Sequence, residues 1–414
     1  MQELVTNLGI LAKNASYKLA LLSSEEKNQA LNAMADSLEK HRLAIKSANA
    51  LDLKLATDLS KPLLERLNLS DKTIDSMISG IRDIIKLDDP VAKLITSKIL
   101  ANGMELKKVR VPIGVIGIIF ESRPNVVADV AALCLKSGNA VILRGGKEAE
   151  HSNRAIMDAL SAGLAQINFT PEAVQLIPVQ DRMAVTYLCR LNNYVDVIIP
   201  RGGESLIKAV TDCATVPVIK HYKGVCHIYV DDSADISMAL SICHNAKCSR
   251  PSVCNAAESI VVHENIAPEF LPKLAELFHA NGVEMRADES ARALCPSMKM
   301  ANPIDFSTEY LDLIVSIKVV ANIEQAIKHI NKHGSHHSDA IIANNQLSQQ
   351  AFTRQIDSAA VYVNASTRFT DGAIFGLGAE IGISTDKLHA RGPMGLNELC
   401  TYKWVGKGHG HIRV

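Results

Sequence analysis

The sequence has few of the residues by which proteins bind nucleic acids or anionic membranes. It contains one tryptophan, its aromatic content is 4%, and its 44 lysine and arginine residues balance 44 aspartate and glutamate residues. Stacking on bases requires aromatic side chains, and binding to phosphate backbones or anionic bilayers requires a surplus of positive charge. The composition therefore argues against a nucleic-acid-binding protein and against a protein of anionic membrane surfaces.

The sequence also has no long apolar run. The longest one, Val111–Phe120, has ten residues, whereas a helix needs roughly 20 apolar residues to cross a bilayer. The first residues have a helical pattern without the core of a signal peptide. Nine cysteines, an odd number, do not suit a disulfide framework. These absences predict a soluble protein of the cytoplasm.

Apolar residues follow two successive patterns of strand and helix. The first ninety residues have helical spacing behind candidate caps at Ser23 and Ser70. From residue 113 onwards, short apolar runs typical of strands buried on both faces alternate with helical segments, and the alternation restarts after Glu258. We therefore expect an α/β protein with two doubly wound domains. The first domain is predicted at 1–97 and 112–235, and the second at 236–390.

A short hairpin is predicted at Asn102-Gly103, because a type I′ turn needs positive φ at both central residues. A two-stranded ribbon is barely stable alone, so it must pack on another segment. Residues 399–414 also have the pattern of a polar ribbon with glycine turns. We expect 98–111 and 391–414 to form a small β-ribbon that serves as a subunit contact in a homo-oligomer.

Two glycine-rich loops follow strands of the first predicted sheet. One is Arg144-Gly145-Gly146-Lys147, and the other, PRGGES at 200–205, opens a helix. Glycines that let a ligand approach, a helix N-terminus and nearby cations together suit phosphate groups. Double glycines are also common in turns, and neither loop is a GxGxxG fingerprint. On pattern alone, a nucleotide site and ordinary turns are equal alternatives.

The segment at 245–258, NAKCSRPSVCNAAE, joins the two predicted blocks and contains Cys248 and Cys254. Pro251 between them prevents a regular helix. A cysteine on a loop near a positive charge such as Arg250 has the setting of a reactive thiolate. The more frequent alternative for any one cysteine is a small buried hydrophobe, so other evidence must decide between the two interpretations.

Several histidines and cysteines cluster in the sequence without the spacing of a metal site. The histidines at 333–337 and 409–411, and Cys243-His244 with the two cysteines that follow, match no structural zinc pattern. We therefore predict no metal.

Five stretches carry motifs of one known family. They are FESRPNV at 120–126, SRPSVCNAAE at 249–258, TEYLDLIVSIKVV at 308–320, VANIEQAIKHINKHGSHHSDAI at 320–341 and FTDGAIFGLGAEIGISTDKLHARGPMGL at 369–396. The chain resembles, over essentially its whole length, the glutamate-5-semialdehyde dehydrogenases, or γ-glutamyl phosphate reductases, of the aldehyde dehydrogenase superfamily. The resemblance implies an aldehyde-dehydrogenase-like fold and an NADP-dependent, phosphorylating aldehyde dehydrogenase. It makes 1–97 and 112–235 the nucleotide-binding domain and 236–390 the catalytic domain. In the biosynthetic direction such an enzyme reduces L-glutamyl 5-phosphate with NADPH to L-glutamate 5-semialdehyde, the second step of proline biosynthesis from glutamate.

The resemblance also implies roles for particular residues. The Cys254 thiolate would attack the acyl phosphate, and the resulting thioester would take a hydride from NADPH. The N–H of Cys254, with Ser122 or Asn125, would hold the oxyanion. Functional coupling to glutamate 5-kinase is compatible with this assignment. The resemblance places the cofactor on Arg144, Gly145, Lys147, Gly202, Gly203, Ser205 and Glu309, and the substrate on Arg250, Ser252, Asn255, Ser366 and Arg368.

One departure from the wider superfamily separates an acyl phosphate reductase from a hydrolytic aldehyde dehydrogenase. Hydrolytic aldehyde dehydrogenases carry a glutamate before the cysteine, where it activates water against the thioester. The corresponding stretch here, Lys220–Val230, contains no glutamate. Its absence favours an acyl phosphate reductase over a hydrolytic NAD-dependent semialdehyde dehydrogenase.

Two other interpretations make different predictions. An inactive relative would be expected to lack Cys254 or the cofactor loops, and a zinc protein would contain metal in an elemental assay. For Arg250, a structural salt bridge is an equal alternative to phosphate binding.

Overall fold

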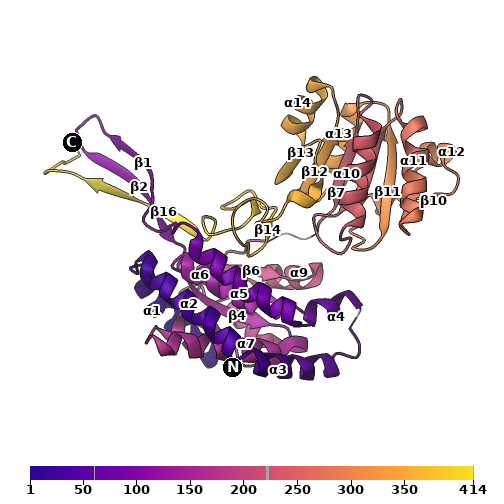
Figure 1. The fold of residues 1–414 in the computed structure, drawn as a ribbon. Coiled ribbons are helices and arrows are strands. Elements are labelled where there is room, and N and C mark those ends of the chain that lie inside the picture. The colour runs from indigo at the N-terminus through magenta and orange to yellow at the C-terminus, as the bar shows by residue number, and fades with distance from the viewer. Residues whose placement is uncertain (60, 221–222, 414) are drawn as a thin grey trace. The chain divides into compact units, whose positions relative to one another are not determined.

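The computed structural model describes residues 1–59, 61–220 and 223–413, and the chain divides into two compact units. Unit 1 comprises Met1–Lys220, Gly376–Gly382 and Met394–Val414, and unit 2 comprises His221–Phe375 and Ile383–Pro393. Each unit combines a parallel sheet with helices (Figure 1). None of the helices in the described ranges is both long and apolar enough to span a membrane.

Unit 1 begins with helices whose caps agree with the sequence. Ser23 forms a capping box with Glu26, and the hydroxyl oxygen of Ser70 accepts the N–H of Thr73 at 3.2 Å. Each cap satisfies an N–H group that has no partner within its helix. The helices are α1 (Gln2–Leu19), α2 (Ser24–Lys40), α3 (Arg42–Leu55), α4 (Lys61–Leu67) and α5 (Asp71–Lys86).

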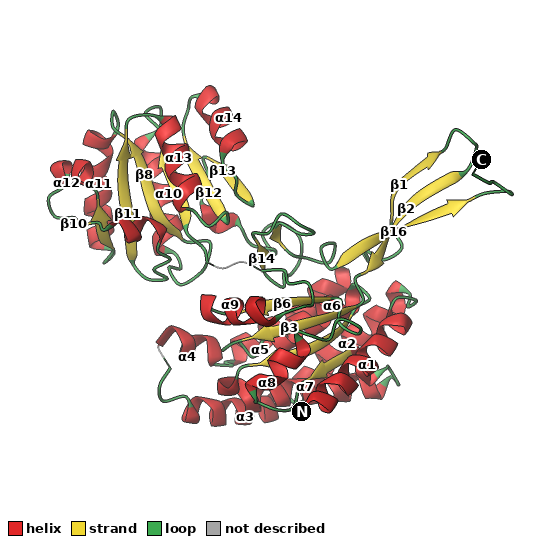
Figure 2. Ribbon diagram, turned by 180° about the vertical axis from the view of Figure 1, so that it is seen from behind, coloured by secondary structure: helices red, strands yellow, loops and turns green. Residues whose placement is uncertain are grey.

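The parallel sheet of unit 1 has the strand order β5-β4-β3-β6, and Figure 2 shows its neighbouring strands β3 and β6 among the helices of the unit. Every residue of β3 and β4 is buried, as expected for strands that are covered on both faces. The strands are β3 (Val115–Phe120), β4 (Ala140–Gly145), β5 (Val174–Leu176) and β6 (Val197–Arg201). The helices of this part are α6 (Val126–Lys136), α7 (Glu150–Gln166), α8 (Arg182–Leu188) and α9 (Glu204–Cys213).

Unit 2 contains a parallel sheet of seven strands in the order β10-β9-β11-β8-β7-β12-β13. Its strands are β7 (Cys226–Val230), β8 (Ala257–His263), β9 (Glu284–Ala287), β10 (Lys299–Met300), β11 (Ile314–Val320), β12 (Ser338–Ile342) and β13 (Ala360–Val363). The helices are α10 (Ile236–Cys248), α11 (Ala267–Ala280), α12 (Glu289–Leu294), α13 (Ile323–His333) and α14 (Gln346–Gln355), and β14 (Ile383–Ser384) pairs with β15 (Gly392–Pro393).

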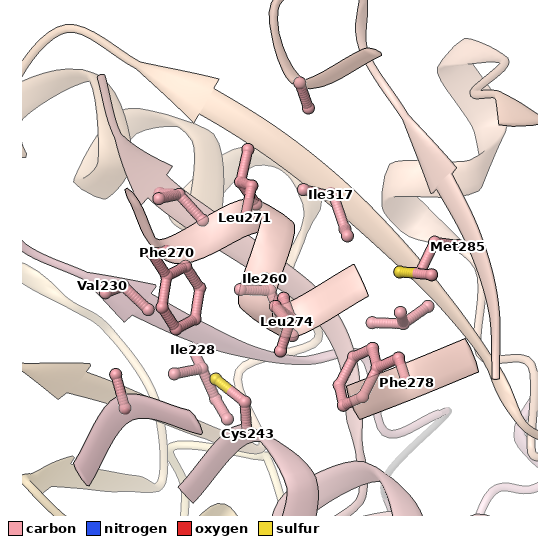
Figure 3. Packing of buried hydrophobic residues seen from close by; sticks show 14 of the residues in the cluster. Ile228, Val230, Cys243, Ile260, Phe270, Leu271, Leu274, Phe278, Met285 and Ile317 are labelled. Atoms are coloured by element: carbon pink, nitrogen blue, oxygen red, sulfur yellow. The ribbon is translucent and has the colours of Figure 1, made fainter. Parts of the chain in front are cut away.

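The core on one face of this sheet consists of aromatic and aliphatic side chains. Phe270, Leu274 and Phe278 of α11 are fully buried and belong to one cluster with Ile228 of β7 and Ile260 of β8 (Figure 3). Burial of an apolar side chain of this size contributes about 1.5–3 kcal/mol. The cluster therefore fixes β8, which follows the loop of Cys254, and the neighbouring strand β7.

The boundary between the units differs from the one that the sequence predicts. The expected boundary is at 235/236, but β7 pairs in parallel with β8 and β12, so residues 226–230 belong to unit 2. An apolar strand pattern shows that a strand is interior without showing which sheet it joins. Similarly, the apolar run at 216–219, one of the strand-like runs after residue 113, contributes a single parallel bridge between Ile198 and Val218.

The predicted ribbon is a three-stranded antiparallel sheet in which β2 (Glu105–Pro112) lies between β1 (Leu94–Ile99) and β16 (Cys400–Lys407), as Figure 2 shows. The turn at 100–104 is not type I′, because Gly103 has a φ of 87° while Asn102 is not in the left-handed region. The Asn102 side chain instead accepts the N–H of Met104 at 3.2 Å. An asparagine that bonds its own turn in this way does not need positive φ.

Candidate active site

Cys254 lies on the loop between α10 and β8 of unit 2 and is half-buried. The helix ends at Cys248, three residues before Pro251, in agreement with the predicted loop. Burial raises the pKa of the Cys248 thiol, which lowers its thiolate fraction. All nine cysteines are free thiols, so Cys254 is available as a nucleophile.

The start of β7 and the residues before it support the backbone of Cys254. The thiol of Cys226 donates a hydrogen bond to the carbonyl oxygen of Cys254, with a sulfur–oxygen distance of 3.2 Å. Burial, aided by neighbouring acidic groups, raises the pKa of Cys226, which keeps this thiol protonated as a donor. A Cβ atom on Gly224 would lie 1.9 Å from the carbonyl oxygen of Cys254. Only glycine fits this contact, because a side chain there would displace the cysteine's backbone.

Asn255 ties the cysteine's loop to residues 366–371. Its side-chain N–H₂ donates to the carbonyl oxygen of Thr370 at 2.9 Å, and its carbonyl oxygen accepts the hydroxyl of Thr367 at 2.7 Å. Its side-chain oxygen accepts a hydrogen bond from the guanidinium of Arg368. The hydroxyl oxygen of Ser366 accepts the N–H of Arg368 at 3.3 Å. The structure therefore brings together three of the predicted substrate residues, and two of them, Asn255 and Arg368, also bond the loops to each other.

The neighbourhood of Cys254 is positively charged. Burial lowers the pKa of Arg368, and the nearby charge of Arg250 lowers it further, whereas Asp371 and Cys254 act in the opposite direction. Arg250 is exposed and forms no ion pair with any residue in the described ranges. Ser252 lies on the same loop, two residues before the cysteine. Two adjacent cations favour a thiolate and attract an anionic substrate.

Glu309 contacts the same corner of unit 2. Its carboxylate accepts the N–H of Gly224 at 2.8 Å, and the ammonium of Lys223 donates to the carbonyl oxygen of Ser307 at 3.0 Å. The segment 307–309 is therefore bonded to the residues that support the cysteine. Of the predicted stretch Lys220–Val230, residues 221 and 222 lie outside the described residues.

In unit 1, the two predicted oxyanion donors already have acceptors. Both the N–H and the hydroxyl of Ser122 donate to one carboxylate oxygen of Glu148, at 2.6 and 2.9 Å. The side chain of Asn125 donates to Asp129 at 2.9 Å. Desolvation raises the pKa of Asp129 to about 6, although the Asn125 hydrogen bond and the charge of Arg201 oppose this shift. Glu148 therefore joins the loop after β3 to the glycine-rich loop after β4.

The two cations of that glycine-rich loop have different surroundings. The guanidinium of Arg144 is buried and donates to the carbonyl oxygens of Gly145 at 2.6 Å and Gln180 at 2.9 Å. Burial lowers the pKa of Arg144. Lys147, by contrast, is exposed. Arg144 thus organises the loop, whereas the ammonium group of Lys147 is accessible from solvent.

The second glycine-rich loop forms the N-terminus of α9. Gly203 is the N-cap, Gly202 precedes it, and Ser205 lies in the first turn. The first N–H groups of a helix have no acceptor within the helix and attract anions. The carboxylate of Glu121 already accepts the N–H of Gly203 at 3.0 Å. An acid at this position shows that the helix end binds an anionic oxygen.

The sequence did not point to several residues that shape the site. Gly224 and Cys226 support the cysteine's backbone, and Thr367 and Thr370 bind Asn255. Gly224 is one of 23 glycines, and no local motif marks it. No group of three or more potential metal ligands in the described part of the chain is arranged to hold an ion.

The contact at Gly224 predicts the effect of a single methyl group. We expect Gly224→Ala to slow alkylation of Cys254 by iodoacetamide about tenfold, because relief of the overlap moves the cysteine's backbone at a cost of about 1–3 kcal/mol. Gly80→Ala is the matched control, since a Cβ at Gly80 in α5 meets its first neighbour only at 3.9 Å. Mass spectrometry measures both rates, and an unchanged rate for Gly224→Ala would contradict the assignment.

Comparisons with known proteins agree with this architecture. The model of the aldehyde dehydrogenase family matches residues 4–301. A γ-glutamyl phosphate reductase of Carboxydothermus hydrogenoformans is 52% identical over 411 residues, which cover 99% of each chain. That of Clostridium beijerinckii is 50% identical over 415 residues, which cover 100% of each chain.

A solved structure extends the similarity to three dimensions. The crystal structure of γ-glutamyl phosphate reductase from Thermotoga maritima matches with a TM-score of 0.97 at 46% identity, and the match covers 99% of this chain and 100% of that one. The aldehyde-dehydrogenase-like fold and the resemblance seen in the sequence motifs are therefore confirmed. The chain belongs to the γ-glutamyl phosphate reductases, enzymes of the aldehyde dehydrogenase family.

Proposed function

We propose that the protein reduces L-glutamyl 5-phosphate to L-glutamate 5-semialdehyde and inorganic phosphate with NADPH, through a thioester on Cys254. Membership of the family supports this step of proline biosynthesis. The observation that carries the proposal is the setting of Cys254. Its thiol is half-buried, Cys226 and Asn255 hold its loop on two sides, and the cations Arg250 and Arg368 lie nearby.

The thiolate of Cys254 attacks the acyl carbon, which forms a C–S bond. The C–O bond to the phosphoryl group then breaks, and phosphate leaves with the electron pair. Arg250, exposed and without an ion-pair partner among the described residues, is positioned on the loop to neutralise the leaving phosphate. We assign the α-carboxylate to Arg368. The N–H of Cys254 and either Ser122 or Asn125 hold the oxyanion, and either side chain must exchange its present carboxylate partner to do so.

Enzymes of the aldehyde dehydrogenase family use a nicotinamide cofactor, which supplies the hydride that converts the thioester into a thiohemiacetal. The residues of unit 1 suit a dinucleotide, because the N-terminus of α9 binds anionic oxygen and Lys147 offers an exposed cation. We assign the pyrophosphate to the end of α9, with Gly202, Gly203 and Ser205, and a ribose to Glu309. Collapse of the thiohemiacetal breaks the C–S bond and returns the Cys254 thiolate.

The two cysteines of the active-site segment test the assignment of the nucleophile. We expect Cys254→Ala to abolish turnover, because the substituted side chain cannot form a thioester, and to leave the melting temperature nearly unchanged. Cys248→Ala, the control, should retain at least about half of the activity, since burial raises the pKa of this thiol above its ordinary value. NADP reduction with glutamate semialdehyde and phosphate is the assay. Activity in the first variant and none in the second would reverse the assignment.

The absence of a glutamate between Lys220 and Val230 predicts that semialdehyde oxidation depends on phosphate. Without phosphate, the thioester has no efficient acceptor, so about one NADPH per active site should form before the reaction stalls. Addition of phosphate should restart turnover and yield glutamyl phosphate. Stopped-flow absorbance measures the burst. Sustained turnover in buffer free of phosphate and arsenate would instead identify a hydrolytic dehydrogenase.

The different exposure of the two cations predicts which of them selects NADPH. Lys147→Ala should raise the KM for NADPH about tenfold and leave the KM for NADH nearly unchanged. The 2′-phosphate of NADPH accepts a charge-assisted hydrogen bond from the lysine, and the 2′-hydroxyl of NADH forms no bond of this strength. Lys40→Ala, at another exposed position of unit 1, serves as the control. Equal effects of Lys147→Ala on both cofactors would place the 2′-phosphate elsewhere.

The ribbon is our candidate for the contact between subunits. Leu94, Ile99 and Trp404 are exposed by 57%, 68% and 51%, which leaves apolar surface on the two outer strands of the small sheet, β1 and β16. Deletion of residues 401–414 removes most of β16 and should lower the mass measured by light scattering to that of smaller species. An unchanged mass would exclude the ribbon as the interface.

The chemistry of the substrate suggests where the enzyme acts. An acyl phosphate is labile and cyclises or hydrolyses in water, so its transfer from the kinase that forms it favours functional coupling to glutamate 5-kinase. We place both enzymes in the cytoplasm.

A further inference from the structure

The buried ion pair of Lys247 and Glu258 lies outside the residues assigned so far. The ammonium nitrogen of Lys247 is 2.7 Å from one carboxylate oxygen of Glu258, and neither side chain has exposed surface. Lys247 is the penultimate residue of α10, and Glu258 is the second residue of β8. The pair therefore closes the two ends of the loop that carries Cys254.

Such a pair is a costly way to fill a core. Desolvation raises the pKa of Glu258 to about 7 in spite of the adjacent ammonium, so burial of the charge is unfavourable. Two apolar side chains would occupy the same space without this cost. They would not, however, accept a hydrogen bond, and the carboxylate of Glu258 has a second oxygen that does so.

That second oxygen accepts the backbone N–H of Leu311 at 3.2 Å. Leu311 has a φ of 55°, in the left-handed region that residues with a side chain rarely adopt. A strained backbone persists only where its surroundings fix it. Glu258 supplies this constraint, and its own carbonyl oxygen is held by the hydroxyl of Ser316 at 3.2 Å.

The turn at Leu311 follows Glu309 by two residues. Glu309 accepts the N–H of Gly224, and Gly224 packs against the carbonyl oxygen of Cys254. Glu258 therefore connects two segments of the candidate site. It lies at the end of the loop that carries Cys254, and its side chain accepts a hydrogen bond from the turn that follows Glu309. Movement of this carboxylate would alter the position of Glu309 relative to the loop.

We propose that Glu258, held by Lys247, is a positioning residue that fixes Glu309 for contact with the nicotinamide cofactor. The inference rests on the proposed function, in which Glu309 binds a ribose of NADPH. Glu258 itself touches neither cofactor nor substrate in this assignment, and acts through the backbone of residues 309–311.

Two double variants isolate the hydrogen bond to Leu311. Both Lys247→Met/Glu258→Gln and Lys247→Met/Glu258→Leu remove the ion pair as a unit, so neither leaves a single buried charge. The glutamine retains an oxygen that can accept the N–H of Leu311, and the leucine has a similar size but no acceptor. The comparison between them therefore measures the positioning effect apart from the loss of charge.

NADPH fluorescence, titrated with the full chain, gives the dissociation constant. We expect the leucine variant to bind NADPH about tenfold more weakly than the glutamine variant, with alkylation of Cys254 by iodoacetamide within about twofold in both. Equal dissociation constants would overturn the inference. A failure of the unaltered protein to bind NADPH would instead overturn the proposed function, and the inference with it.

A measurement on the unaltered protein covers the case in which the leucine variant does not fold. The amide of Leu311 should exchange its hydrogen at least about tenfold more slowly than an unstructured peptide. The glutamine variant should retain most of this protection. Exchange at the unstructured rate in the unaltered protein would show that Glu258 does not hold the turn, and would overturn the inference.

Discussion

The contact between Gly224 and the carbonyl group of Cys254 is the constraint on which the active site of unit 2 depends. A Cβ at this glycine would lie 1.9 Å from the carbonyl oxygen, so the chain before β7 reaches the cysteine's backbone only because no side chain intervenes. The approach places the Cys226 thiol within hydrogen-bonding distance of the same carbonyl, and the N–H of Gly224 within reach of Glu309. The absence of a side chain at Gly224 therefore allows three segments to meet: the residues before β7, the loop of Cys254 and the segment of Glu309.

Burial determines whether a lysine or arginine side chain bonds groups of the protein itself or remains accessible from solvent. Arg144 and Lys247 are buried, and their charges are used to hold a backbone loop and a carboxylate. Lys147 and Arg250 are exposed, which leaves them accessible to phosphate groups. Arg368 is intermediate, because it bonds Asn255 and Ser249 while its charge still acts on the nearby thiol. Lysine and arginine residues of similar appearance in the sequence therefore divide into buried cations that hold the fold and exposed cations that remain accessible to a ligand.

Carboxylates organise both glycine-rich loops of unit 1. Glu148 accepts two hydrogen bonds from Ser122, and Glu121 accepts the first N–H group of α9. These acids already interact with the donors that we propose for the oxyanion and the pyrophosphate, so in that assignment ligand binding requires an exchange of hydrogen-bond partners. A dinucleotide pyrophosphate carries two negative charges, one on each phosphate, whereas a carboxylate carries one, so the pyrophosphate competes well for a helix N-terminus.

The sequence by itself determined the local features of this protein. Apolar periodicity and the caps at Ser23 and Ser70 specified most strands and helices, Pro251 placed Cys254 on a loop, and the family motifs identified the enzyme class. These features depend on residues that are close in the chain. The contacts that complete the site join distant residues, such as Cys226 with Cys254 and Asn255 with Thr370. The sheet to which β7 belongs, the burial of Arg144 and the role of Glu258 were therefore decided only by the tertiary structure, because each depends on which segments pack together.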